Sequence, residues 1–186
     1  MLQYKKLTET EIIELAKNND FKALEELIRR NQKNVFATFS FLVKKRENIA
    51  DLTQETLLRV AKNLNSLKNP KNFKSWLNQI ITNLYYDEIR KNNKKPECIS
   101  IDENPLPIVD LKCKPHEKCI SSELDQVIKK AILELPEHFK IAIILREFEG
   151  LSYEEIAKLT NTNIGTVKSR ISRARDRLQC DLQGYI

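Results

Sequence analysis

The chain is organised around the stretch SYEEIAKLTNTNIGTVKSRISRARDRL, residues 152–178. Ser152 is followed three positions later by Glu155, which is the spacing of a capping box at the start of a helix. Apolar residues at helical spacing come next, and after a short turn Asn163 supplies a second N-cap. The stretch therefore predicts a short helix over 153–160, a tight turn and a second helix that starts just after Asn163.

The second predicted helix has an apolar face and a cationic face. At about 100° per residue, Ile171, Ala174 and Leu178 lie within about 40° of Val167. The far side holds Gly165, Thr166, Ser169, Ser172 and Arg173, flanked by Lys168, Arg170 and Arg177. Small residues permit close approach to DNA, hydroxyl and guanidinium groups read base edges, and long cations hold phosphates. The alternative is a solvated basic surface, but the preceding capped helix and short turn favour a helix-turn-helix.

Composition and charge narrow the class of protein. The chain has 186 residues, a formal net charge of +6 and only 3 glycines. Helical periodicity dominates and no convincing alternating stretch is present, so we predict an all-α fold. Residues 1–95 contain 19 Lys and Arg against 11 Asp and Glu, whereas residues 123–186 contain 10 of each, with the cations concentrated in the last helix. This distribution predicts two separate contacts with a polyanion.

Targeting signals and disulfides are not expected. The amino terminus, MLQYKKLTETEII, lacks the apolar core of a signal peptide, and no run of about 18 apolar residues occurs. We therefore expect a cytoplasmic protein with no direct membrane insertion. In that compartment the 4 cysteines are expected to be reduced thiols.

The first half predicts a helical domain over 1–95. Thr8 and Glu11 form a capping box for a short helix, and a longer helix is expected over 20–45. Its predicted core residues are Phe21, Leu24, Leu27, Ile28, Val35, Phe36, Phe39, Leu42 and Val43. The next helix is expected to bury Ile49, Leu52, Leu57, Val60 and Leu64 and to expose Asp51, Gln54, Glu55 and Arg59. An acidic, amide-rich face does not favour DNA, so it is interpreted as a protein contact, with a solvated surface as the alternative.

The segment that follows Pro70 combines an apolar stripe with aromatic and cationic residues. The stripe is Phe73, Trp76, Leu77, Ile80, Ile81 and Leu84, and we expect Trp76 in the core. The other faces gather Asn83, Tyr86, Asp87, Arg90, Lys91, Lys94 and Lys95. Aromatic rings interleaved with cations suit unpaired bases, because a base stacks on a ring while the cations follow its phosphates.

Residues 96–122 are predicted to be a flexible linker, since they hold four of the 6 prolines and show no sustained period. At about 3.3 Å per residue, this segment reaches roughly 90 Å, enough to seat two domains well apart. It contains Cys113, His116 and Cys119, with Cys98 as a possible fourth zinc ligand. Structural zinc, redox sensing and incidental residues are three open alternatives. No metal site or cofactor is predicted.

The last domain is expected over 123–186. Apolar residues of ELDQVIKKAILEL and EHFKIAIILREFEG predict two supporting helices, the second starting after Pro136 and ending at Gly150. With the helix-turn-helix they form a unit of about four helices.

The order of these parts resembles the extracytoplasmic-function (ECF) sigma factors of bacterial RNA polymerase, in the sigma-70 family. The resemblance covers nearly the whole chain and lies in three motifs, DLTQETLLRV at 51–60, FKSWLNQIITNLYYDEIRK at 73–91, and LELPEHFKIAIILREFEGLSYEEIAKLTNTNIGTVKSRISRARDRL at 133–178. It implies a region-two domain that binds core polymerase and opens the minus-10 promoter element, and a region-four domain that reads the minus-35 element. It implies no covalent chemistry, so no enzyme activity is expected.

The resemblance also implies roles for individual residues. Asp51, Gln54 and Glu55 match the contact with the coiled coil of the β′ subunit, and the β subunit is a further polymerase partner. Asn72, Phe73 and Lys74 match the segment that captures a flipped base of the non-template strand. Asn83, Asp87, Arg90 and Lys91 match the stretch at the upstream edge of the minus-10 element, and Thr166, Lys168, Ser169, Arg170 and Arg173 match the recognition helix. Many family members are held inactive by an anti-sigma factor.

Two departures from the family pattern lie in the helix-turn-helix. Asn161 replaces a common glycine, and Asn accepts left-handed geometry. Asn163 stands where serine is usual, and it serves equally as a cap. The recognition-helix side chains set the sequence preference, so the promoter does not follow from the family. The competing hypotheses are a dimeric helix-turn-helix regulator with an unrelated sensor domain and a metal enzyme built on Cys113, His116 and Cys119.

Overall fold

The computed structural model describes the backbone of residues 4–92 and 115–183, with side chains of the second range described from residue 124. All regular structure in these two ranges is helical, which confirms the predicted all-α class. The first range, here called the front domain, contains α1 (Glu9–Lys17), α2 (Phe21–Leu42), α3 (Arg46–Asn63) and α4 (Phe73–Asn92). The second range, the back domain, contains α5 (Pro115–Glu134), α6 (Glu137–Glu147), α7 (Tyr153–Leu159) and α8 (Ile164–Leu182). Three short 3-10 helices, Tyr4–Lys6, Leu64–Ser66 and Pro70–Asn72, lie in the front domain.

Local capping sets the helix boundaries of the front domain. The capping box of Thr8 and Glu11 forms as predicted at the start of α1. Asn19, with φ of 65°, turns the chain after α1, and the Asp20 side chain then accepts hydrogen bonds from the first amides of α2. The end of α2 lies three residues before the predicted residue 45, because Val43 adopts an extended conformation.

The core of the front domain lies between α1, α2, α3 and α4. Leu27, Val35 and Phe39 of α2 are fully buried, and Phe73 and Ile81 of α4 are at most 1% exposed. Two residues of the predicted α2 stripe were assigned wrongly, since Phe21 is 80% exposed and Phe36 38% exposed. A helical period gives the direction of a side chain but does not show whether a neighbouring element covers it.

The amino-terminal segment is held to α2 by a charged cluster. Arg29 and Arg30 both donate hydrogen bonds to the largely buried Glu26, and these bonds hold the pKa of its carboxyl at about 2. Arg30 also donates to the carbonyls of Tyr4 and Leu7. The cluster therefore joins the first 3-10 helix to the middle of the domain.

The first helix of the back domain, α5, begins before the predicted domain start at residue 123. Helix α5 begins at Pro115, within the segment 96–122 that was predicted as linker, and eight residues before the predicted domain boundary. Proline is favourable in the first turn of a helix, and the residues after it lack the apolar stripe on which the boundary prediction relied. The helix α6 ends as expected before Gly150, whose φ of 65° allows the amide of Leu151 to bond the carbonyl of Leu145.

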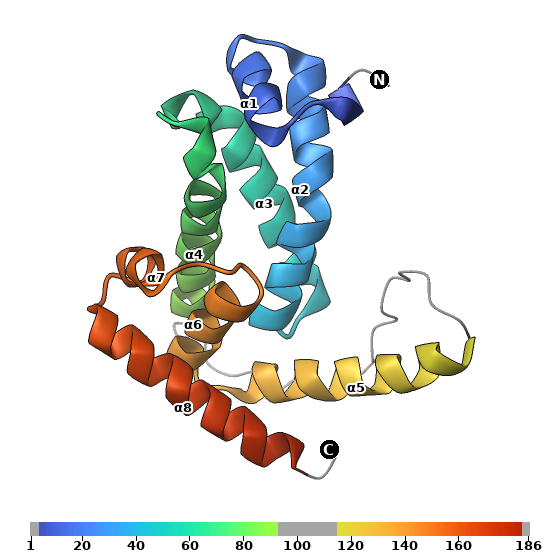
Figure 1. The fold of residues 1–186 in the computed structure, drawn as a ribbon, viewed down its shortest axis with the longest axis vertical. Helices are drawn as coiled ribbons and strands as arrows, with labels where there is room; N and C mark the ends of the chain where they lie inside the picture. The colour runs from blue at the N-terminus through green and yellow to red at the C-terminus, as the bar shows by residue number, and fades with distance from the viewer. Residues whose placement is uncertain (1–3, 93–114, 184–186) are drawn as a thin grey trace.

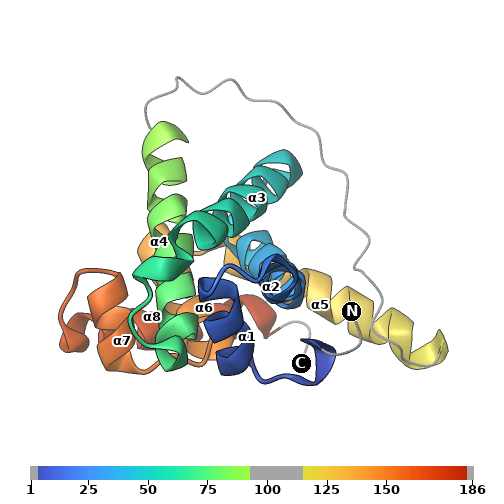
Figure 2. The ribbon, with the colours of Figure 1, turned by 90° about the horizontal axis from the view of Figure 1, so that it is seen from above.

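The two domains lie against each other (Figure 1), where α7 lies beside α4 and the end of α5 lies beside α2. Contacts also join α2 and α6. From above (Figure 2), α7 lies at one side of the front domain and α5 extends away from it on the other side. The linker prediction allowed well-separated domains, whereas the described arrangement brings them into direct contact. Among the described residues, no helix is long and apolar enough to cross a membrane.

Candidate nucleic-acid and protein interfaces

The helix-turn-helix forms as the sequence predicts. The amide of Ser152 donates to Glu155 at 2.8 Å and the amide of Glu155 donates to the Ser152 hydroxyl at 3.2 Å. Asn161 turns the chain with φ of 51°. Asn163 then caps α8 by accepting a 2.7 Å hydrogen bond from the amide of Thr166. These local hydrogen bonds and the turn at Asn161 determine the residue at which α7 and α8 each begin.

Helix α8 buries its predicted apolar stripe and presents its cations outward. Val167, Ile171 and Ala174 are at most 1% exposed. On the other face Lys168, Ser169 and Arg173 are exposed, while Thr166 and Arg170 are half-buried. The outer face is thus a row of cationic and hydroxyl groups, of the kind that contacts phosphates and base edges.

Two contacts from the end of α6 hold the helix-turn-helix in place. The guanidinium of Arg146 lies 4.8 Å from the ring centroid of Tyr153 and donates to the carbonyl of Leu151 at 2.8 Å. Arg175 of α8 pairs with Glu147, which raises the pKa of Arg175, first through the hydrogen bond and then through the charge of the carboxylate. Arg175 therefore joins α8 to α6 through an ion pair, whereas Arg173 is exposed on the outer face of α8.

The predicted minus-10 residues lie along α4 in two groups. Asn72 and Lys74 are exposed where α4 begins, and Arg90 and Lys91 are exposed near its end. At about 1.5 Å per residue these groups are separated by roughly 25 Å. Asn83 lies between them, exposed, and accepts a hydrogen bond from Gln79 at 3.0 Å. Asp87 is half-buried and pairs with Arg90 at 2.9 Å.

Phe73 belongs both to the predicted apolar stripe of α4 and to the predicted base-capturing segment. The ring of Phe73 is 1% exposed and lies 6.0 Å, between centroids, from the ring of Trp76. The Phe73 ring therefore packs in the core of the front domain and offers no exposed surface on which a base could stack. The predicted inward position of Trp76 is confirmed in part, since this ring packs against the core and is half-buried.

The predicted acidic face forms an exposed ridge on α3, defined here as Asp51, Gln54, Glu55 and Leu58. Asp51 and Gln54 are exposed, and Glu55 is half-buried and pairs with Arg59 at 2.7 Å. On one side of the ridge, a cleft of about 690 Å³ is lined by residues of α3 and α4. Its charged lining residues are Asp51, Glu55, Arg59, Asp87, Glu88, Arg90 and Lys91. The structure thus brings the predicted polymerase-binding acids and part of the minus-10 group to one cleft.

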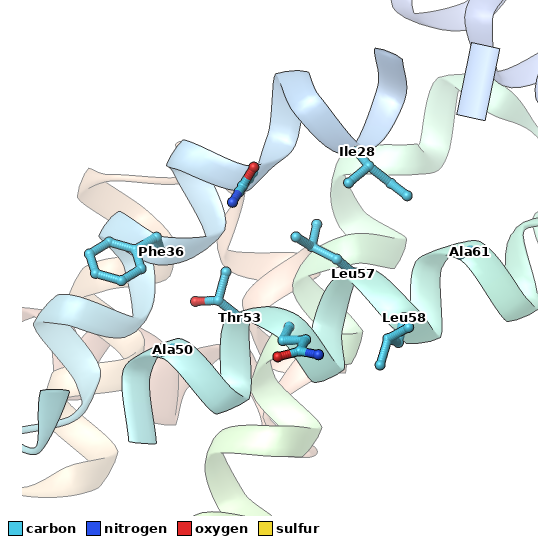
Figure 3. Close-up of a pocket in the computed structure, with 9 residues that line it drawn as sticks. Ile28, Phe36, Ala50, Thr53, Leu57, Leu58 and Ala61 are labelled. Atoms are coloured by element: carbon cyan, nitrogen blue, oxygen red, sulfur yellow. The ribbon is translucent and has the colours of Figure 1, made fainter. Parts of the chain in front are cut away.

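On the other side of the ridge is an apolar groove between α2 and α3 (Figure 3), with a volume of about 520 Å³. Ile28 and Phe36 line it from α2, and Leu57 and Leu58 line it from α3. Leu58 is 45% exposed. An acidic ridge beside an exposed apolar groove is more typical of a protein contact than of a solvated helix.

The cysteine and histidine residues of the predicted linker are not tested. Cys98 and Cys113 lie outside the described residues, as do the side chains of His116 and Cys119. The described cysteine, Cys180, is free and exposed near the end of α8.

The sequence prediction missed the residues that join the two domains. Glu149, in the turn after α6, is 2% exposed and accepts hydrogen bonds from Thr38 and Asn78 of the front domain. Tyr85, which was not in the predicted stripe of α4, is 2% exposed and donates to Glu137 of α6. Burial first, and then the Glu137 acceptor, raises the pKa of Tyr85. Asn78 within an otherwise apolar helix face was the sequence signal that could have pointed to this contact.

A helix-turn-helix with a cationic outer face, joined to a helical domain with exposed cations along one helix, defines a two-domain DNA-binding protein. Residues 125–178 match the model of sigma-70 region 4, and residues 27–95 match the model of sigma-70 region 2. The chain belongs to the ECF sigma factors of the sigma-70 family, which act with RNA polymerase in transcription initiation and are not enzymes.

Curated relatives resemble the chain over nearly its full length. The ECF RNA polymerase sigma-E factor of Haemophilus influenzae is 32% identical, over 95% of this chain and 96% of the relative. The sigma-E factor of Escherichia coli is 33% identical, over 97% of both chains.

Two solved structures share the fold. The sigma factor RpoE of Bartonella quintana, crystallised in complex with the anti-sigma factor NepR, is 31% identical over 88% of this chain and 97% of that one, with a TM-score of 0.63. CnrH, in complex with the cytosolic domain of CnrY, is 18% identical over 95% of this chain and 97% of its own, with a TM-score of 0.66. At that identity, the likeness to CnrH shows the fold alone.

Proposed function

We propose that this sigma factor directs promoter-specific initiation by reading the minus-35 element with α8 and by opening the minus-10 element with the front domain. The observation that supports this most directly is the outer face of α8. Its cations and hydroxyls are exposed or half-exposed on a helix whose start is fixed by the Asn163 cap. The reading residues in this proposal are Thr166, Lys168, Ser169, Arg170 and Arg173.

The front domain contacts the minus-10 element through polar residues of α4 and of the turn before it. Asn72 and Lys74 flank the buried Phe73, so they provide the contacts to a base that leaves the stack. Asn83, Asp87, Arg90 and Lys91 contact the upstream edge of the element. Arg90 and Lys91 are exposed cations, which suits contacts to phosphates.

Core polymerase binds the ridge on α3. Asp51, Gln54 and Glu55 meet the coiled coil of the β′ subunit, and the β subunit contacts the back domain. The exposure of Asp51 and Gln54 and the apolar groove beside Gln54 support a protein partner at this position. In this arrangement, the sigma factor performs no covalent step; it supplies sequence specificity and stabilises the melted strand.

An anti-sigma factor is a further proposed partner. Support comes from the RpoE protein of Bartonella quintana, which was crystallised with the anti-sigma factor NepR. A small protein encoded beside this gene, with one membrane span or a zinc-binding anti-sigma motif, is the candidate to test. Its cytosolic part should inhibit transcription by the holoenzyme and leave transcription with another sigma factor unchanged. If it inhibits both equally, it is not this partner.

Permanganate probing of unpaired thymines tests the role in strand opening. The holoenzyme formed with this chain should make thymines of the minus-10 element reactive. Lys74→Ala should lower that reactivity, because it removes an exposed cation next to the base-capturing turn. Lys22→Ala, which removes an exposed lysine from α2, is the matched control. Equal loss in the two variants would contradict the placement of base capture at Lys74.

A further inference from the structure

Helix α1 packs against the turn that joins α3 to α4. This turn, residues 67–74 and here called the capture turn, includes Asn72 and Lys74, to which the proposed function assigns the contacts with an unpaired base. Helix α1 contacts both 3-10 helices of this region, Leu64–Ser66 and Pro70–Asn72 (Figure 1). An element from the amino-terminal part of the chain therefore supports a segment that is assigned to DNA.

One hydrogen bond joins a side chain of α1 to the backbone of the capture turn. The ammonium of Lys17, the last residue of α1, donates to the carbonyl of Leu67 at 2.7 Å, and Lys17 is half-buried. This carbonyl comes directly after the helical stretch formed by α3 and the 3-10 helix Leu64–Ser66, where carbonyls lack a partner within the helix. A cation at such an end is favoured by its charged hydrogen bond and by the helix dipole.

Charge pairing within the neighbouring sequence does not hold the capture turn. Residues 56–86 contain no Asp or Glu, so the exposed lysines of the turn have no carboxylate in this stretch to pair with. The hydrogen bonds within the turn are short-range, since the amide of Lys71 donates to the Asn69 side chain and the amide of Asn72 donates to the Asn69 carbonyl, each at 3.0 Å. Lys17, by contrast, reaches the turn across 50 positions of the chain.

Helix α1 is itself held in place, so it can act as a rigid support. The capping box at Thr8 fixes its start, and Arg30 of α2 donates to the carbonyl of Leu7, just before that cap, at 2.9 Å. Ile12 and Ile13 in the middle of the helix are fully buried. A group on a fixed element places its partner more precisely than a group on a free loop.

We propose that Lys17 is a positioning residue for strand opening. Through the carbonyl of Leu67 it holds the capture turn in the shape in which Asn72 and Lys74 meet an unpaired base. The positioning of the turn rests on the contacts alone, whereas its effect on DNA also rests on the proposed function. Because the ammonium bonds a backbone carbonyl, Lys17 acts on DNA through the turn and not by contacting a phosphate.

Hydrogen exchange of the full chain without DNA tests the positioning. Lys17→Met keeps an aliphatic side chain of similar length and removes the donor, whereas Lys17→Arg keeps a charged donor. The amides of Lys71 and Asn72 report on the turn, because each donates a hydrogen bond within it. In Lys17→Met, the peptide that covers residues 67–73 should exchange about tenfold faster, as expected for loss of a charged hydrogen bond.

Two variants serve as controls for the exchange measurement. Lys17→Arg should exchange like the unchanged chain, and so should Lys22→Met, which alters an exposed lysine of α2. Unchanged exchange of the turn in Lys17→Met would overturn the proposal. Equally faster exchange throughout α2, α3 and α4 would show that Lys17 stabilises the whole domain, which would also overturn a local positioning role.

Binding of a forked DNA by the holoenzyme tests the effect on the unpaired base. The probe comes from a promoter selected with the same holoenzyme; it is double-stranded upstream and single-stranded, with the non-template strand only, through the minus-10 element. Lys17→Met should weaken binding by about three- to tenfold, because apparent affinity falls with the fraction of molecules whose turn has the binding conformation. Lys17→Arg should restore the affinity. A duplex fragment with only the minus-35 element should be bound equally by all variants.

The dependence on salt separates positioning from a phosphate contact. Loss of one phosphate contact reduces the slope of log K against log salt concentration by about 0.9 for duplex DNA and about 0.7 for a single strand. Lys91→Ala, which removes an exposed cation of α4, should show such a reduction. Lys17→Met should bind the fork more weakly with an unchanged slope. A reduced slope in Lys17→Met would make Lys17 a phosphate contact and refute its positioning role.

The outcomes separate the support of the turn from the proposed function. Faster exchange in Lys17→Met together with unchanged binding of the fork would refute a role in base capture and leave the support of the turn in place. If the unmodified holoenzyme shows no preference for the fork over one of scrambled minus-10 sequence, the proposed function is refuted, while hydrogen exchange still reports on the turn.

Discussion

Arg173 provides the sharpest test of how α8 reads DNA. Its side chain is exposed on the outer face, and the described residues include no salt bridge or hydrogen bond to it. Arg173→Ala should therefore change the free energy of unfolding by less than about 0.5 kcal/mol, as for other exposed positions. Loss of a base-edge contact should instead weaken promoter binding by about 1 to 3 kcal/mol, which corresponds to about 5- to 150-fold in Kd.

Arg175 is the matched control for this test. It lies two residues further along α8 and is also exposed, but it pairs with Glu147 of α6. Arg175→Ala removes a surface ion pair worth about 1 kcal/mol or less and no base contact. It should leave promoter binding within about twofold of the unchanged chain.

Fluorescence anisotropy of labelled promoter DNA with the holoenzyme measures both variants. A suitable promoter is obtained by selecting bound fragments from randomised DNA with the same holoenzyme. Thermal unfolding of each variant shows whether the fold is retained. Equal affinity of Arg173→Ala and the unchanged chain would refute the base-reading role of Arg173, and equal loss in the two variants would refute the distinction between a reading and a structural arginine.

Three further predictions concern the polymerase contact, the helix cap and the dependence on pH. Asp51→Arg places a cation on the exposed ridge and should weaken binding to core polymerase by about tenfold in pull-down titration, without lowering thermal stability; unchanged binding would contradict the role of the ridge. Asn163→Ala removes the 2.7 Å bond to the amide of Thr166 and should cost about 1 kcal/mol in urea unfolding, and no loss would show that the cap does not stabilise α8. Glu26, with a pKa lowered from 4.5 to about 2, stabilises the fold above pH 4.5, and this contribution is lost as pH falls toward 2. The melting temperature of Glu26→Gln should therefore lie below that of the unchanged chain at pH 7 and converge with it near pH 2, and a constant difference would contradict the ion cluster.

Local features of the sequence predicted local structure well. Two helix caps illustrate this, the capping box of Ser152 and Glu155 and the cap at Asn163. Each is a hydrogen bond between residues three positions apart, so the sequence spacing is enough to predict it. Val167 and Ile171 are buried because apolar residues recur at helical spacing on one face of α8, and that face packs against the rest of the domain. The start of α8 and its buried apolar face were therefore predictable from the sequence.

Tertiary neighbours explain the errors. Phe73 was predicted in the apolar stripe of α4 and is buried there, so its position in the base-capturing motif does not make its ring accessible. Phe21 has the right period for the core and yet is 80% exposed, because no described element covers that end of the stripe. The start of α5 at Pro115 did not follow from the sequence, because the first turns of this helix show no apolar period. For the two phenylalanines, the missing information was which surface another element covers.

The domain contact was beyond the reach of periodicity. Glu149 and Thr38 are 111 residues apart in the chain, and nothing in either local sequence indicates the other. A glutamate before a glycine at a helix end has the appearance of a solvated turn. Only the fold shows that this carboxylate is buried among donors from two helices of the other domain.

Run-off transcription with purified core polymerase tests the central claim most directly. On a template with a selected promoter, core polymerase alone should give no specific transcript, and addition of this chain should give one transcript of defined length. Altering either the minus-35 or the minus-10 element should reduce that transcript. Promoter-specific transcription only when another sigma factor is added would contradict the account.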